Sequence, residues 1–249
     1  HNLNQKASGK PGAVQAAPFG TTNPPGQSDL SWWLEVWRNA TWVQVAKNSV
    51  VIGVLSAALA TLLGTLAALG LSRPEMPFRR WIMAILISPM IVPVIITATG
   101  MFFFYSDIRL TQTYSGIILA HALLGIPFVV ITVTATLVGF DRSLERAAAS
   151  LGASPFVTLR RVVLPLILPG LVSGALFAFA TSFDEVVVVL FVGGHDQQTI
   201  PRQMFSGIRE QISPTILAAA TILAAISILL LTTVELLRRR SERLQGSSA

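Results

Sequence analysis

The 249-residue sequence has no cysteine and few charged side chains. Without thiols the chain can form neither disulfides nor thiolate metal sites. Charged residues make up only 12% of the sequence, whereas 52% are hydrophobic and the mean hydropathy is +0.65. Because a soluble domain carries about 25% charged residues, the composition predicts a membrane protein.

The chain also lacks a phosphate-binding loop of the Gly-x-x-x-x-Gly-Lys-Ser/Thr type. Its only Gly-Lys pair, Gly9-Lys10, is followed by proline. ATP hydrolysis is therefore not expected of this chain. No Ser/His or His/Glu spacing indicates an intramembrane enzyme. The net charge of +6 requires no nucleic-acid partner, because the basic residues lie in the segments between the apolar runs.

The sequence does contain long uncharged apolar runs, which predict an all-α membrane protein. Each run has about 19 to 25 residues, enough to cross a hydrocarbon core of ~30 Å at 1.5 Å per residue. Five are present, at 50–71, 81–105, 114–138, 162–183 and 216–234. Pro89 and Pro93 are expected to break the second run and Pro127 the third. The small residues Ala60, Gly64 and Ala68 predict close helix packing.

The placement of arginine predicts the orientation of these runs. Eleven arginines lie in 72–80, 139–161 and 235–249, but only three in 106–113 and 184–215. By the positive-inside rule the first group, including the C-terminus, is cytoplasmic. Residues 1–49 are then expected outside, as a flexible linker followed by an interfacial helix over 31–42, with Trp32, Trp33 and Trp37. No apolar run precedes them, so we expect a missing first helix; the alternative is a five-helix protein with an external N-terminus.

Residues 141–161 predict a helix, a glycine hinge and a second helix. The first helix would have Asp141 as its N-cap and an apolar face of Leu144, Ala147, Ala148 and Leu151. Gly152 would end it, and Ser154-Pro155 would begin a second helix with Phe156, Leu159 and Val163 on one face. Small side chains would let another protein approach closely, and Arg142, Arg146, Arg160 and Arg161 could pair with its carboxylates or with anionic lipid. A simple connector would need far fewer residues.

Asp184 and Glu185 are candidate residues of a transport pathway, because acids at membrane depth face a cavity or a partner. They would attract an amine cation. The alternatives are an ion pair with Arg202 or Arg209, or a cap for the next element. Phe183 and Tyr105 join the candidate pathway, although the aromatic run that ends at Tyr105 is first of all an interfacial belt. His121 is expected to bond across helices rather than bind substrate.

The loop resembles the EAA loop of ABC importer permeases. Ala147 to Gly152, followed by Val162 and then Leu164-Pro165, matches that pattern's spacing. One departure is that Arg146 occupies the place of the family's glutamate, with Glu145 one residue earlier. The residues that the resemblance assigns to contact with an ATPase are Arg142, Glu145, Arg146, Ala147, Ala148, Gly152, Ala153, Ser154 and Pro155.

From about Asn48 to Arg240 the chain is similar to the second permease subunit of spermidine/putrescine importers. The similarity is clearest in the runs that start at Leu124, Gly139 and Ser182. It implies a six-helix, type I ABC importer fold in the bacterial inner membrane, surrounded by membrane lipid. The permease domain would cover 50–240, with the external segment 1–49 before it and a cytoplasmic tail, 241–249, after it.

The resemblance also implies partners. These are a second permease subunit in a heterodimer, two ATPase subunits that bind ATP and Mg, and an external solute-binding protein; this chain itself would bind no cofactor. The solute stays open between polyamines, opines, amino acid derivatives, iron and anions, and the acidic segment 184–215 argues against anions. A passive channel would leave the 141–161 loop unexplained.

Overall fold

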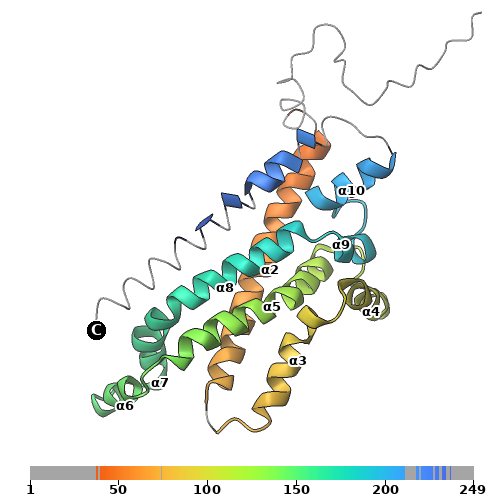
Figure 1. The fold of residues 1–249 in the computed structure, drawn as a ribbon. Coiled ribbons are helices and arrows are strands. Elements are labelled where there is room, and N and C mark those ends of the chain that lie inside the picture. The colour runs from red at the N-terminus through yellow and green to blue at the C-terminus, as the bar shows by residue number, and fades with distance from the viewer. Residues whose placement is uncertain are drawn as a thin grey trace, which may run out of the picture.

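The computed structural model describes residue 38, residues 40–73 and 75–210, and within 217–236 residues 217, 218, 220–226, 228, 229, 232, 233 and 236. Every regular element in this part of the chain is helical (Figure 1). In chain order the elements are α2 (Ala40–Leu71), α3 (Arg79–Ile91), α4 (Val94–Asp107), α5 (Tyr114–Val138), α6 (Ser143–Ser150), α7 (Pro155–Thr158), the π-helix η1 (Leu159–Val163), α8 (Leu164–Asp184), α9 (Val187–Val192) and α10 (Ile200–Glu210).

Three long helices, α2, α5 and α8, lie side by side and form the centre of the molecule (Figure 1). Each is long and apolar enough to cross a membrane, the third as a continuous helical stretch from Pro155 to Asp184. They confirm the first, third and fourth predicted spans. The helix of the first span begins at Ala40, earlier than expected, and Trp42 belongs to it. Pro127 was predicted to break the third span, and that prediction is wrong, because α5 continues through it.

Small residues let these helices approach closely. A Cβ atom on Gly125 of α5 would lie 2.9 Å from the Cβ of Ala178 in α8 and 3.1 Å from the Cβ of Ala60 in α2. A Cβ on Gly64 would lie only 2.7 Å from the Cβ of Val129. Because real Cβ atoms do not approach this closely, the contact requires glycine. The predicted small-residue stripe on α2 is therefore a helix-packing surface, as is usual in membranes.

The second predicted span, 81–105, is not one straight helix. It consists of α3 and α4, and this pair is bent by 103° at the break between them. The break falls at Val92, which has an extended ψ of 132°, and at Pro93. Proline lacks a backbone N–H and disfavours helical geometry in the residue before it, so both effects act at one point. Pro89 lies inside α3 and does not end it.

Hydrogen bonds show which loops share an end of the molecule. Arg142 Nη2, just before α6, donates to the carbonyl oxygen of Ser72, just after α2. At the opposite end, Gln112 N–H donates to the Val192 carbonyl at 2.7 Å, and Asn48 Nδ2 to the Asp196 carbonyl at 2.8 Å. The predicted alternation is thus confirmed for the loops that the structure describes, whereas the segment 235–249 lies almost wholly outside the described residues. Although bent, the α3–α4 pair leads from one end of the core to the other.

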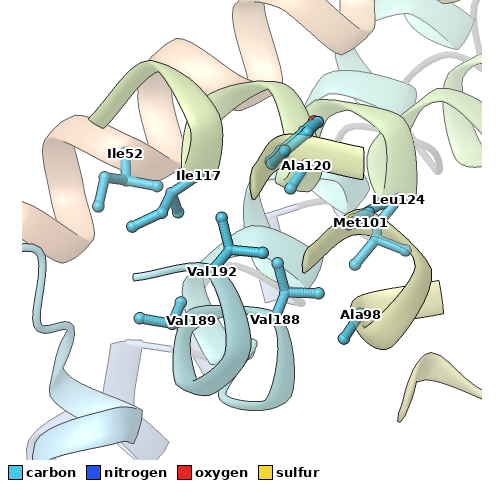
Figure 2. Packing of buried hydrophobic residues seen from close by; sticks show 10 residues of the cluster. Ile52, Ala98, Met101, Ile117, Ala120, Leu124, Val188, Val189 and Val192 are labelled. Carbon is cyan, nitrogen blue, oxygen red and sulfur yellow. The ribbon is translucent and has the colours of Figure 1, made fainter. Parts of the chain in front are cut away.

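The short helix α9 packs back into the core at the second end. Its residues Val188, Val189 and Val192 are fully buried against α4 and α5 (Figure 2). Their neighbours in the cluster include Ala98 and Met101 of α4 and Ile117, Ala120 and Leu124 of α5. This cluster holds α4 against the core beyond the bend.

Several predicted segments fall wholly or partly outside the described residues. These are the linker and interfacial helix before residue 38, the tail 241–249 and part of the fifth span, 216–234. The described residues of that fifth span are helical. Among them, Ala218 and Ile222 pack in a cluster with Trp42 and Phe183.

Candidate functional site

The first helix of the predicted coupling loop, α6, begins at Ser143. The Oδ1 atom of Asp141 accepts the Ser143 backbone N–H at 2.8 Å, and its Oδ2 accepts the Ser143 hydroxyl at 2.6 Å. These bonds hold the pKa of the Asp141 carboxyl below its usual value, because they favour its charged form. The N-cap position itself is Arg142, so the assignment to Asp141 is wrong by one residue, although Asp141 does bind the helix start.

Gly152 ends α6 in a left-handed conformation, with φ of +82°. The Gly152 N–H bonds the carbonyl oxygen of Ala149 at 2.9 Å, and the Ala153 N–H bonds that of Ala148 at 3.0 Å. This pair of bonds is a Schellman motif, in which glycine is favoured because the left-handed conformation carries no Cβ penalty. The predicted end of the helix at Gly152 is confirmed.

The second helix of the loop is continuous with a membrane span. Ser154 caps α7, since its Oγ accepts the Val157 N–H at 3.4 Å, and Pro155 occupies the first turn. The π-helix η1 then joins α7 to α8 without a gap. Pro165 follows in the first turn of α8, where a missing N–H is tolerated. A displacement of α7 would therefore be passed along one helical rod.

The two short helices present an uncovered apolar surface. Leu151 is 89% exposed, Phe156 69% and Leu144 43%, and α6 has no buried residue. Ala147 is exposed, whereas Ala148 and Ala153 are half-buried. Exposed apolar groups that lie together make this surface a candidate for contact with a protein.

Beneath this surface lies a cavity of about 920 Å³ between the loop and the ends of α2 and α5. Leu66 and Leu69 of α2, Phe140, Glu145, Ala149 and Phe156 are among its lining residues. Arg142, predicted to face a partner, also lines it and donates to the Ser72 carbonyl. Arg146 of α6 is exposed and is not among those lining residues.

The predicted pathway residues do not form one cluster. Asp184 is exposed at the end of α8, but Phe183 is 2% exposed and stacks on Phe179 with ring centroids 5.4 Å apart. Tyr105 is buried in a different cluster, with Met101 and the α9 valines.

The two acids of the predicted pair have different surroundings. Glu185 Oε1 accepts the backbone N–H groups of Val187 at 2.7 Å and Val188 at 3.0 Å, which confirms a cap for the next element. Asp184 carries no such bond to α9. Arg202 Nη1 donates to the Gly194 carbonyl at 2.7 Å, and burial lowers the pKa of its guanidinium. The side chain of Arg209 lies outside the described residues.

His121 bonds across helices, as predicted. Its Nδ1 lies 2.7 Å from Ser182 Oγ of α8, and the ring is 1% exposed. This bond joins α5 to α8 near the C-terminal end of α8.

A polar network that local sequence patterns do not indicate joins α2 to the loop after α9. Asn48 Nδ2 donates to the carbonyl oxygens of Asp196 at 2.8 Å and Gln198 at 2.9 Å. The Tyr114 hydroxyl donates at 2.9 Å to the same Asp196 carbonyl, and Ile200 N–H donates to Ser49 Oγ at 2.8 Å. The one sequence signal for this network was the position of Asn48 beside the first apolar run. An amide that becomes buried there needs hydrogen-bond partners.

The described structure is that of a helical membrane chain in which one span continues into a helix–glycine–helix loop. The chain belongs to the family of binding-protein-dependent transport system inner membrane components, whose pattern matches residues 60–244. It is a multi-pass inner-membrane permease of the ABC importer class.

Curated relatives cover most of the chain. The spermidine/putrescine transport system permease protein PotC of Haemophilus influenzae is 33% identical over 211 residues, which is 85% of this chain and 82% of that protein. PotC of Escherichia coli is 32% identical over 84% of this chain and 79% of its own length. The putrescine transport system permease protein PotI of Escherichia coli is 30% identical over 77% and 71%.

Solved structures share the fold. A chain of the MetNI methionine ABC transporter in an inward-facing conformation matches with a TM-score of 0.64 and 19% identity, covering 86% of this chain and 99% of that one. A chain of an amino acid ABC transporter matches with a TM-score of 0.62 and 16% identity, over 86% and 99%. The type I importer fold predicted from the sequence is confirmed.

Proposed function

We propose that this chain forms half of the translocation pathway of an ATP-driven polyamine importer. The observation that carries the solute class is the similarity to spermidine/putrescine permeases, at 33% identity over 85% of the chain. The exposed acid at the end of α8 agrees with a cationic solute, because a carboxylate there would attract an amine and repel an anion.

The proposed partners are a second permease, two ATPase subunits that carry ATP and Mg, and an external solute-binding protein. The end of the molecule with α6 and α7 faces the cytoplasm, and the end with α9 and α10 faces outward. The ATPase contacts the exposed apolar surface of α6 and α7, and the proposed coupling residues from Arg142 to Pro155 lie in or beside it. ATP binding and hydrolysis can shift access only if nucleotide and solute have different affinities for the two conformations.

The loop transmits motion by two routes that the geometry supports. One is the continuous helical path from α7 through η1 into α8. The other is the bond from Arg142 to the Ser72 carbonyl, which ties α6 to the end of α2. Because α2, α5 and α8 pack closely at glycines, force on the loop would move all three together.

The test is ATPase stimulation and radiolabelled uptake by the reconstituted complex with its solute-binding protein. The panel contains spermidine, putrescine, an opine, a neutral amino acid, sulfate and ferric iron. Stimulation and uptake with the polyamines, and not with sulfate, are expected. Uptake of sulfate or iron alone would overturn the polyamine assignment, and uptake without ATP would overturn the importer mechanism.

A further inference from the structure

Helix α8 packs against both of the other long helices and has further surface that these two helices do not cover. Toward α5 it presents Gly170, Gly174, Ala178 and Ser182, each in close contact with that helix. Toward α2 it presents Phe179, which approaches Gly53, and Phe183, which packs with Trp42. Described residues of the fifth span, Ile222, Leu223 and Ile226, pack with Phe179 and Phe183 as well. The residues of the remaining face that are discussed next are half-buried or exposed and belong to none of the three buried clusters.

That open face carries residues that are unusual for contact with lipid. Ser173, Phe177, Ala180 and Asp184 follow one another at spacings of four, three and four, which places them on one stripe of an α-helix. We name these four residues the α8 stripe. Lipid-facing positions favour leucine, isoleucine and valine, whereas a carboxylate and a hydroxyl are expensive there.

The middle residue pair of the site is aromatic and includes Phe177 of the stripe. Phe177 stacks on Phe128 of α5, with ring centroids 6.1 Å apart and an angle of 20° between the rings. Both side chains are half-buried, so part of each remains accessible beside the stripe. Aromatic faces attract cations because of the negative charge density above the ring.

The hydroxyl of the stripe is uncommitted. Thr132 and Thr136 of α5, like Thr99 of α4, donate their hydroxyls to carbonyl oxygens of their own helices. Within the described part of the chain, the hydroxyl of Ser173 makes no such bond, and the residue is half-buried. In the bilayer such a group needs a polar partner.

We propose that the α8 stripe, with Phe128, is a binding track for an extended aliphatic amine cation. Asp184 receives an ammonium group at the outer end, the Phe128–Phe177 pair holds a second ammonium or the methylene chain, and Ser173 accepts a hydrogen bond from an ammonium group farther in. Ser173 and Asp184 are eleven positions apart, which corresponds to about 16 Å along the helix, enough for a chain with two or three amines. Phe183 and Tyr105, which are buried in separate clusters, take no part in it.

The track rests on the proposed function, because it supposes that amines cross this subunit. Since the chain has no cysteine, single cysteines can be introduced without background. The complex in nanodiscs, with any native cysteines of its partners replaced, is treated with a membrane-impermeant cationic methanethiosulfonate. Ser173→Cys and Ala180→Cys sample the track. Leu168→Cys, exposed on another face of α8, is the lipid-side control, and Arg80→Cys, exposed at the start of α3, is the control outside the track.

Both track cysteines are expected to react, and spermidine is expected to slow their labelling several-fold while leaving Arg80→Cys unchanged. Leu168→Cys is expected to stay unreactive. Track cysteines that do not react, or that react equally fast with and without spermidine, would overturn the track. Two positions are used so that a failure of one variant to assemble leaves the other decisive.

Uptake separates this inference from the proposed function. If the parent complex transports no polyamine, the proposed function fails. If the parent transports spermidine but Phe177→Leu and Asp184→Asn leave its uptake rate unchanged, only the track fails. We expect each to lower the uptake rate about two- to fivefold, the range of a single exposed cation–π or charge contact. Asp107→Asn, an exposed acid at the outer end of α4, is the matched control and should transport normally.

Discussion

At the scale of single residues, Asp184 and Glu185 are adjacent but have different surroundings, and Gly152 is required for a reason other than space. Glu185 uses its carboxylate to bind the first N–H groups of α9, while Asp184, one residue earlier, remains exposed. A Cβ atom added to Gly152 would have no heavy atom within 4 Å, so there is room for a side chain. The φ of Gly152, however, is +82°, which side chains disfavour. The requirement for glycine there comes from the backbone and not from crowding.

Replacing Gly152 therefore tests backbone conformation alone. Alanine in the left-handed conformation costs about 1–2 kcal/mol, and asparagine tolerates it better. We expect uptake per ATP hydrolysed to fall in the order Gly, Asn, Ala, Val, because a weakened Schellman motif lets α6 and α7 move independently. Gly100→Ala, at an open helical position in α4, is the control and should keep normal coupling. Equal coupling in the alanine and valine variants would contradict a rigid hinge.

Replacing the two acids separately tests their division of roles. Glu185→Ala removes both bonds to α9 and should destabilise the subunit by about 1 kcal/mol, as loss of a helix cap does. Glu185→Gln keeps an acceptor oxygen and should restore most of that stability and normal uptake. Thermal unfolding of the purified complex measures the first effect and polyamine uptake the second. A strong uptake defect in a stable Glu185→Gln complex would give Glu185 a place in the pathway after all.

At the scale of elements, the sequence was most informative where the signal is local. Gly152, Ser154 and Pro155 each have a defined preference at helix ends, so the coupling loop could be predicted nearly to the residue. Uncharged runs likewise indicated α2, α5 and α8. The small residues from Ala60 to Ala68 indicated their packing.

Elements that depend on distant partners could not be predicted. The valines of α9 are apolar enough to extend the preceding span, and only the cap at Glu185 and the packing against α4 turn them into a separate helix. Pro93 and Pro127 gave the same signal in the sequence. Of these two, Pro93 breaks its helix and Pro127 does not. The neighbours of α5 support Pro127, whose ring is fully buried. The track on α8 depends on which face the other helices leave open.

The bond between Arg142 and Ser72 joins two elements, and its removal should affect coupling more than folding. In Arg142→Ala, α6 loses its attachment to the end of α2, and we expect uptake per ATP to fall several-fold while assembly is preserved. Arg142→Lys can still donate one bond to the carbonyl and should recover part of the loss. Arg80→Ala, an exposed arginine near the same end, is the control. Unchanged coupling in Arg142→Ala would leave the α7–η1–α8 path as the sole route.

At the scale of the whole molecule, both ends of the three-helix core are clamped by polar bonds. Arg142 holds one end, and the network around Asn48 and Tyr114 holds the other. Between them the helices meet at glycines and alanines and have little freedom to slide. Among the helices of the described residues, only the α3–α4 pair carries a sharp bend. On the proposed function the subunit would move as one body, with the coupling loop at one end and Asp184 at the other. The coupling loop would then have to lie on the cytoplasmic side of the membrane.

That orientation can be measured in intact cells, again because the chain has no cysteine. Leu151→Cys, at the tip of the coupling loop, should be protected from a membrane-impermeant maleimide until the cells are lysed. Asp196→Cys, exposed in the loop between α9 and α10, should react in cells with a permeabilised outer membrane. The arginines around the coupling loop predict this result, since they resist translocation. Labelling of Leu151→Cys from outside would place the loop away from nucleotide, and a coupling role for α6 and α7 would then be impossible.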